Sequence, residues 1–338
     1  MIGASGPWSI LRGLRAEPPG RAATDGARRA VFAAALEQAE QFLTAAGAVG
    51  YATKPVQLFY ALNQAGRAIA AVHADEPWEI GSHGAGVKSS AEVGATTVEP
   101  DKKPRGAMRV VADATGSELW EGPVTVGSLW ASLPELPADP DLVGSVDRPL
   151  EVELDYFDYR SVPLPSNLAV YTASVPLGVS GYTWRVGLRV ENKPTDDEGQ
   201  SAVAERALAP YPKAAGWSLA RGLVTTNVYG GDQTPILVEW IREDESGDRV
   251  MTPPQLLTEQ YDGKLYFRPG LGRDRAVPSS LITWWGILIA LASLARYESV
   301  AWRRALDIDN SPIASALEQG LGIAEERIPE LVLRAVSA

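Results

Sequence analysis

The order of apolar and polar residues predicts helices near the start of the chain. Apolar side chains recur at helical spacing over residues 27–46, and the same spacing returns from Lys54 after a short link that contains glycine. Pro55 suits the first position of the second helix, and Pro77 lies beyond its expected end near His73. Two helices joined by so short a link are expected to pack as an antiparallel pair.

The middle of the chain has a different pattern, which predicts strands. Short runs there mix β-branched and aromatic residues, partly in alternation, and these runs are residues 108–113, 150–157, 182–190, 236–241 and 264–267. Residues 125–133 and 201–208 have helical composition instead. The spacing of the runs is irregular and shows no internal repeat.

Helices are predicted again at the end of the chain. The longest apolar run covers residues 281–295. Because a membrane span needs roughly 20 apolar residues, this run is predicted to be the central helix of a core, and no membrane association is expected. Two shorter helices, at about 312–319 and 324–335, are expected to follow.

Together these patterns indicate a mixed α+β fold. We divide the chain into an N-terminal helical part (1–103), a β-rich middle region (104–270) and a C-terminal helical part (271–338). Each helical part is short and apolar on one side. The two are therefore expected to pack on each other as one composite helical body, with the β-rich region inserted between them.

Composition and charge narrow the classes of function. The net charge of −11 disfavours broad DNA binding, which needs a concentrated basic face. The absence of cysteine removes disulfides and thiolate chemistry, and two histidines leave no convincing metal site. The first residues lack a secretory signal pattern, so a cytoplasmic location is expected. No cofactor motif is present, and no cofactor is predicted.

The predicted helix from Lys54 carries a polar stripe opposite its apolar face. Tyr60, Asn63, Gln64 and Arg67 lie on this stripe, with Asn63 and Arg67 one turn apart. An amphipathic helix needs a solvated face, which is the simplest interpretation. The alternative is a seam that faces a cleft or a partner, since Tyr60 and Asn63 are unusual on a merely solvated surface.

Arg67 and His73 fit the loose Arg-x4–6-His pattern of HEPN-type ribonucleases. The resemblance implies a homodimer whose shared cleft cleaves RNA, with arginine holding phosphate and histidine transferring protons. The helical wheel counts against this hypothesis, because six residues place the two side chains about 120° apart. A histidine in the last turn of a helix also has a purely structural explanation.

A glycine-rich loop contains the other histidine. His83 and Gly84 lie in this loop, and Lys88 follows. Such a loop can wrap an anion such as the phosphate of a small nucleotide, although the spacing of a phosphate-binding P-loop is absent. The alternative is structural: the glycines make tight turns, and His83 ties the loop to the body of the protein.

Several of these landmarks together resemble the YaaC-like family of bacterial proteins. The resemblance rests on motifs in the same order along the chain, namely Lys54-Pro55 with Tyr60, then His83-Gly84, residues 108–113 with Gly116, Lys264–Phe267 with Arg268-Pro269, and Arg296-Tyr297-Glu298 with Trp302. Together with the polar stripe and the glycine-rich loop, these motifs give the candidate binding residues, which are Lys54, Tyr60, Asn63, His83, Gly84, Lys88, Arg296, Tyr297 and Glu298. Only Lys88 remains here of the family's basic run, which puts a basic patch in doubt.

Arg296 ends the predicted apolar helix and needs a polar partner there. We expect it to pack against the polar stripe or the His83 loop and so to fasten the two helical parts together. The leading functional hypothesis is a non-enzymatic binding or accessory subunit of a bacterial stress or phage-defence module, whose protein partner is another protein or a second copy of the chain in a homodimer. The RNA-cleaving effector and the small nucleotide-binding protein remain the alternatives.

Overall fold

The computed structural model describes residues 6–158, 182–188, 194–220, 236–243, 249–251 and 257–338. The chain forms two compact units. Unit 1 contains Met1–Arg148 and Gly270–Ala338, and unit 2 contains Pro149–Pro269. Helices come from both ends of the chain and most strands from its middle, so the mixed α+β fold is confirmed. Residues 104–148, grouped with the middle region on sequence grounds, lie in unit 1.

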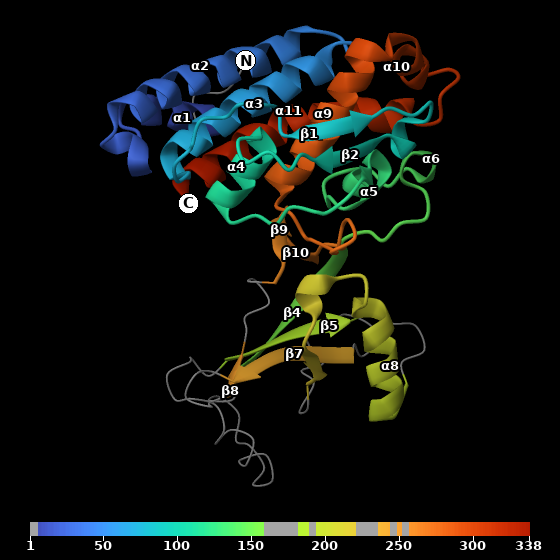
Figure 1. Ribbon diagram of the computed structural model, residues 1–338. Coiled ribbons are helices and arrows are strands. Elements are labelled where there is room, and N and C mark those ends of the chain that lie inside the picture. Colours follow the sequence, from blue (N-terminus) through green and yellow to red (C-terminus); the bar gives the residue numbers. More distant parts are fainter. Residues whose placement is uncertain (1–5, 159–181, 189–193, 221–235, 244–248, 252–256) are drawn as a thin grey trace. The chain divides into compact units, whose positions relative to one another are not determined.

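Helix α3 (Lys54–His73) is the centre of unit 1 (Figure 1). Four helices pack around it, and they are α2 (Gly26–Ala48), α4 (Ala107–Thr115), α9 (Ser280–Tyr297) and α11 (Ala314–Ser337). Fourteen of its 20 residues are buried. Gly66 allows the closest approach, since a Cβ atom there would lie 2.4 Å from the Trp285 ring. Any polar residue on α3 is therefore close to another element.

The predicted apolar helix is confirmed as α9. Ser279 caps its N-terminus through its hydroxyl, which accepts from the backbone N–H of Ile282. By length and composition α9 could cross a bilayer, but 78% of it is buried within the protein. That degree of burial agrees with a core helix.

Two predictions of secondary structure are wrong. Residues 108–113, predicted as a strand, belong to helix α4. Met108, Val111 and Ala112 are buried at the spacing of one helix face, and Gly116 ends the helix in the left-handed conformation with φ 63°. The adjacent valines suggested a strand, but tertiary packing overrides that preference.

The second wrong prediction concerns the C-terminus, where α11 is one continuous helix instead of two. Gly320 lies directly after the first predicted helix, where the second part of α11 continues without a break. Its role is close packing instead, since a Cβ atom at Gly320 would lie 2.0 Å from the Trp130 ring. Pro329 lies inside the helix and removes one backbone hydrogen bond without ending it.

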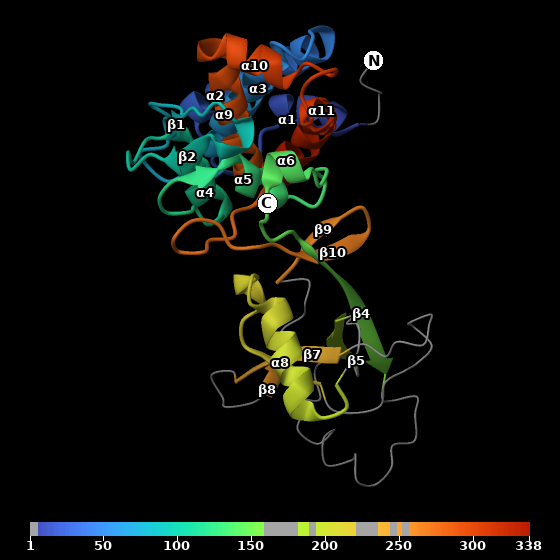
Figure 2. The ribbon, with the colours of Figure 1, turned by 90° about the vertical axis from the view of Figure 1, so that its right-hand side faces the viewer.

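Smaller elements complete unit 1 (Figure 2). The helical ones are α1 (Pro7–Ala16), η1 (Gly20–Ala23), η2 (Val93–Ala95), α5 (Val126–Ala131), α6 (Pro140–Val143) and α10 (Ser299–Ala305). A small antiparallel sheet has the order β1 (Ala85–Lys88), β2 (Thr97–Pro100) and β3 (Val124–Thr125). Strand β1 packs against α9, which brings the loop before it close to the central helices.

Unit 2 contains an antiparallel sheet and α8 (Asp197–Leu208). The strand order is β6-β7-β5-β4-β10-β9, with β8 beside β7. The bounds are β4 (Leu150–Asp158), β5 (Tyr182–Leu188), β6 (Trp217–Leu219), β7 (Ile236–Glu243), β8 (Arg249–Met251), β9 (Glu259–Tyr261) and β10 (Lys264–Phe267). The four strands predicted here are confirmed, although residues 189–190 of one lie outside the described residues.

Its core joins the sheet to the helix. Val186, Trp240 and Phe267 are buried, and Ala204 and Leu208 of α8 pack in the same cluster. The Trp240 and Phe267 ring centroids lie 5.4 Å apart. Unit 2 therefore has a hydrophobic core of its own.

Candidate functional site

The polar stripe of α3 meets the loop before β1 and the end of α9. Five side chains come together there, and we call them the His83 cluster: Tyr60, Asn63, Arg67, His83 and Arg296. Three come from α3, one from the loop and one from the last turn of α9. The cluster is therefore a meeting point of three segments that lie far apart in the sequence.

Asn63 holds the imidazole ring of His83. Its Nδ2 lies 3.4 Å from His83 Nδ1, and only 3% of Asn63 is exposed. Because an amide nitrogen only donates, Nδ1 is the acceptor in this pair, and the ring proton of neutral His83 lies on Nε2. Phe59 packs edge-on at 5.2 Å between ring centroids and limits rotation of the ring. His83 is itself solvent-exposed, so Nε2–H remains a donor for a ligand.

The backbone around His83 is fixed from both sides. Ala107 N donates to the carbonyl of Ser82 at 3.0 Å, and Asp101 N donates to the carbonyl of Gly84 at 2.9 Å. Gly84 has φ +87°, and a Cβ atom there would lie 2.4 Å from the Met108 backbone nitrogen. Only glycine fits this position without displacing α4. The loop thus presents His83 on a rigid backbone.

Positive charge surrounds the imidazole. Partial burial of the ring lowers the pKa of His83 below its usual value of 6.5, and the charges of Arg296 and Arg67 lower it further. In the described part of the chain, neither arginine forms a salt bridge. The two guanidinium groups therefore create a positive field at His83 that no described carboxylate neutralises by a direct contact.

The side chain of Arg296 is held on α9 and reaches towards Tyr60 of α3. Its Nε donates to the Ala292 carbonyl at 3.1 Å, and its Nη1 lies 3.5 Å from the Tyr60 hydroxyl. The first bond holds the stem of the side chain on α9, and the second is at the outer limit of a hydrogen bond. Most of its five N–H donors are still available to a ligand.

Aromatic rings lie on both sides of the charged groups. Phe42 stacks on Tyr60 at 5.5 Å between centroids, and Tyr60 meets the His83 ring at 6.1 Å. Tyr297 is 71% exposed, with the guanidinium carbon of Arg296 5.0 Å from its ring centroid. An exposed aromatic side chain next to a guanidinium offers a surface on which a planar ligand can stack.

Lys54, Lys88 and Glu298 are predicted site residues that do not belong to the His83 cluster. Lys54 is buried and forms an ion pair with Glu325 of α11, Nζ to Oε2 2.6 Å, which links the start of α3 to α11. Lys88 is exposed at the end of β1, opposite Thr97. Glu298 is exposed at the C-cap of α9, and its backbone N–H donates to the Leu294 carbonyl. No described hydrogen bond connects these side chains to His83.

Arg67 and His73 lie in different surroundings within one chain. His73 Nε2 lies 3.2 Å from the carbonyl of Val336 in α11, and His73 lines a cavity of about 310 Å³ with Asp113. Arg67 instead acts on His83. Six residues of helix also separate the two along the axis by about 9 Å. A ribonuclease that pairs Arg67 with His73 would need the pair to be completed by a second chain, and it stays a prediction.

Sequence patterns did not identify Phe42 and Phe59 as part of this site. Both are apolar residues at positions that follow the helical spacing of their helices. That pattern is typical of a core residue and does not indicate a site. Phe59 is indeed fully buried, and Phe42 is partly buried. The adjacent Phe59-Tyr60 pair was the one available signal, since it places one ring in the core and the other at its edge.

Comparison with known proteins identifies the family. The model of the YaaC-like protein family matches residues 15–149 and 203–336, which include every member of the His83 cluster. No curated protein matches the chain, and no solved structure matches it. Because the family model covers most of the sequence in both units, the chain belongs to the YaaC-like family.

Proposed function

We propose that this protein binds a small phosphate-bearing ligand, of the nucleotide class, at the His83 cluster. One observation carries the proposal: Arg67 and Arg296 both act on His83, and neither has a salt-bridge partner in the described residues. Uncompensated guanidinium groups that converge on one point favour a bound anion. Phosphate matches the fork of N–H donors on each guanidinium.

The donors of the cluster suit the same ligand. The Nε2–H of His83, the free N–H groups of Arg296 and the hydroxyl of Tyr60 all come from neighbouring side chains. Asn63 is engaged with His83 and acts by orienting the ring. A phosphate group accepts several hydrogen bonds at once, so such a set of donors binds it better than it binds a carboxylate.

The aromatic side chains favour a nucleotide over inorganic phosphate. Tyr297 is exposed beside Arg296, and Tyr60 lies between Phe42 and His83. Stacking of a base on an exposed aromatic ring contributes about 1–3 kcal/mol in single-stranded nucleic-acid complexes. A base attached to the bound phosphate would gain part of this free energy.

Isothermal titration with ATP, ADP and pyrophosphate tests the proposal. The change to make is Arg296→Gln, and Arg303→Gln is the matched control, since Arg303 is an exposed arginine on the next helix, α10. We expect wild-type protein to bind ATP, Arg296→Gln to bind it about tenfold more weakly, and the control to be unchanged.

Two results would contradict the proposal. The first is the absence of saturable binding of all three ligands at low ionic strength, where electrostatic attraction is strongest. The second is an equal loss of affinity in both arginine variants, which would indicate nonspecific attraction to positive charge. If pyrophosphate binds as tightly as ATP, the aromatic part of the argument is wrong and the phosphate part stands.

A further inference from the structure

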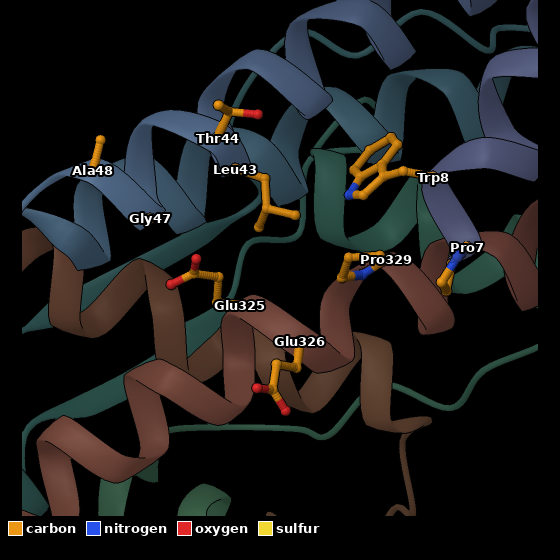
Figure 3. A pocket seen from close by; sticks show the side chains of 9 residues that line it. All are labelled: Pro7, Trp8, Leu43, Thr44, Gly47, Ala48, Glu325, Glu326 and Pro329. Carbon is orange, nitrogen blue, oxygen red and sulfur yellow. The ribbon is translucent and has the colours of Figure 1, made fainter. Parts of the chain in front are cut away.

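A second candidate site lies in a groove between α1, α2 and α11 (Figure 3). The groove has a volume of about 560 Å³, within the usual range for small-molecule sites. Its apolar walls include Trp8 of α1, Leu43 of α2 and Pro329 of α11. None of its lining residues belongs to the His83 cluster, so it is independent of the function proposed above.

The wall from α1 holds a buried donor without an acceptor. Trp8 is only 2% exposed, and no described group accepts a hydrogen bond from its Nε1–H. In Figure 3 this nitrogen lies on the side of the indole ring that faces Leu43 and Pro329. An unsatisfied buried donor is unfavourable, so a ligand that supplies an acceptor here gains affinity from the new hydrogen bond.

The wall from α11 offers acceptors. Pro329 has no N–H, so it cannot donate to the carbonyl of Glu325 one turn earlier, and both residues line the groove. Glu326 lines the groove as well, is exposed and has no salt bridge in the described part of the chain. An ammonium group can donate to a carbonyl and a carboxylate at the same time.

Glu325 closes one end of the groove in a fixed orientation. Lys54 holds its Oε2 at 2.6 Å, which neutralises its charge and leaves Glu326 as the negative group of the groove. Gly47 of α2 lies against the same carboxylate, because a Cβ atom there would lie 2.6 Å from Glu325 Oε1. Glycine at this position lets the side chain of Glu325 lie between the two helices.

We propose that this groove binds a small organic cation that has an apolar body and a carbonyl oxygen. The apolar body packs on Leu43 and Pro329, the carbonyl oxygen accepts from Trp8 Nε1–H, and the ammonium group lies at Glu326 and the carbonyl of Glu325. An amino-acid amide with an aromatic side chain has all three features. An anionic or purely apolar ligand lacks the ammonium group that would lie at Glu326.

Nuclear magnetic resonance with L-phenylalaninamide as the probe tests this site on the full-length protein. The indole N–H signal of Trp8 is identified by its loss in Trp8→Phe, and its shift is followed as the probe is added. We expect a saturable downfield shift as the indole gains an acceptor. N-acetyl-L-phenylalaninamide keeps the ring and the carboxamide, has an added acetyl group and lacks the charge, and we expect it to bind at least threefold more weakly.

Two carboxylates of α11 that lie outside the core, Glu326 and Glu318, provide a test that does not disturb it. Glu326→Gln should weaken binding of phenylalaninamide about two- to fivefold, as expected for one exposed ion pair. Glu318→Gln, two turns earlier on α11 and outside the groove, should leave it unchanged.

Three results would overturn the proposal. They are no saturable shift of the Trp8 signal, equal affinity for the charged and neutral probes, or an unchanged affinity in Glu326→Gln. Each of them is independent of nucleotide binding, and far-ultraviolet circular dichroism checks that every variant is folded.

Discussion

Arg28 lies at one place along α3 and the pair Arg67 and Arg296 at another, and the two places differ in the groups that surround the guanidinium. At the C-terminal end of the helix, Arg28 is 2% exposed and donates to the carbonyls of Ala70, Ala71 and Ala74 at 3.4, 3.3 and 2.9 Å. It also forms an ion pair with Glu76 at 2.9 Å. Near the middle of the helix, Arg67 and Arg296 have no described carboxylate partner.

The difference separates structure from function. Arg28 donates to carbonyls at the C-terminal end of α3, where partners within the helix run out, and its own donors are used in doing so. Among the described residues, Arg67 and Arg296 find acceptors for few of their donors, and their charges act together on His83. Burial with full hydrogen bonding indicates a structural arginine, whereas convergent, unpaired arginines indicate a place for an anion.

The largest effect that separates Arg28 from Arg67 and Arg296 is a loss of stability when Arg28 is replaced. Arg28→Met keeps the apolar stem but leaves buried carbonyls without donors, so the free energy of unfolding should fall by about 3 kcal/mol. Urea denaturation measures this loss. Arg29→Met is the control, because Arg29 is the exposed neighbour of Arg28 and its described side-chain bond is to the Ala23 carbonyl at 2.8 Å. A loss under about 0.5 kcal/mol is expected there. If Arg28→Met bound ATP more weakly and kept full stability, Arg28 would belong with Arg67 and Arg296 as a binding residue.

A smaller loss of stability, combined with a loss of binding, is expected at Gly84. Gly84→Ala places a Cβ atom 2.4 Å from the Met108 nitrogen at φ +87°, so the loop must move and the free energy of unfolding should fall by about 2 kcal/mol. Because the loop carries His83, ATP affinity should fall as well. Gly86→Ala is the matched control, since its Cβ atom would be 4.0 Å from the nearest atom, the Glu99 carbonyl oxygen. Unchanged ATP affinity in folded Gly84→Ala would remove the loop from the site.

The smallest effect is expected from pH. The pKa of His83 is below 6.5 in the free protein because of burial and the charges of Arg296 and Arg67. A bound phosphate offsets those charges and raises the pKa, so binding takes up a proton and becomes tighter as pH falls from about 7.5 towards the lowered pKa. A gain of about threefold is expected by titration calorimetry, beyond any change due to the ligand's own ionisation. His83→Asn retains a donor without titrating and supplies that baseline; an identical pH profile for both proteins would exclude His83.

Periodicity and helix-end residues predicted a large part of the fold. Pro55 and Pro77 bracket α3, and the apolar run of residues 281–295 forms most of α9. The failures at α4 and α11 have one cause. Valine pairs favour strands and glycines disfavour helices locally, but tertiary contacts can override both preferences. At Gly320 the overriding contact is the close packing of the Trp130 ring.

The site was predictable only in part. The polar stripe on α3 follows from the helical wheel, and the need of Arg296 for a partner follows from its place at the end of an apolar helix. The pairing of Asn63 with His83 does not follow from either. It depends on how β1 packs on α9, and no local pattern encodes that contact.

The central place of α3 in unit 1 has a consequence for synthesis of the chain. Its partner α9 begins about 200 residues after α3 ends, so the ribosome must make all of unit 2 in between. At 5–20 residues per second, the apolar faces of α3 wait roughly 10–40 s for the start of α9, and α11 follows later. During that interval α2 is the one long helix already made that can cover α3, so a nascent chain paused within unit 2 exposes a surface that chaperones bind.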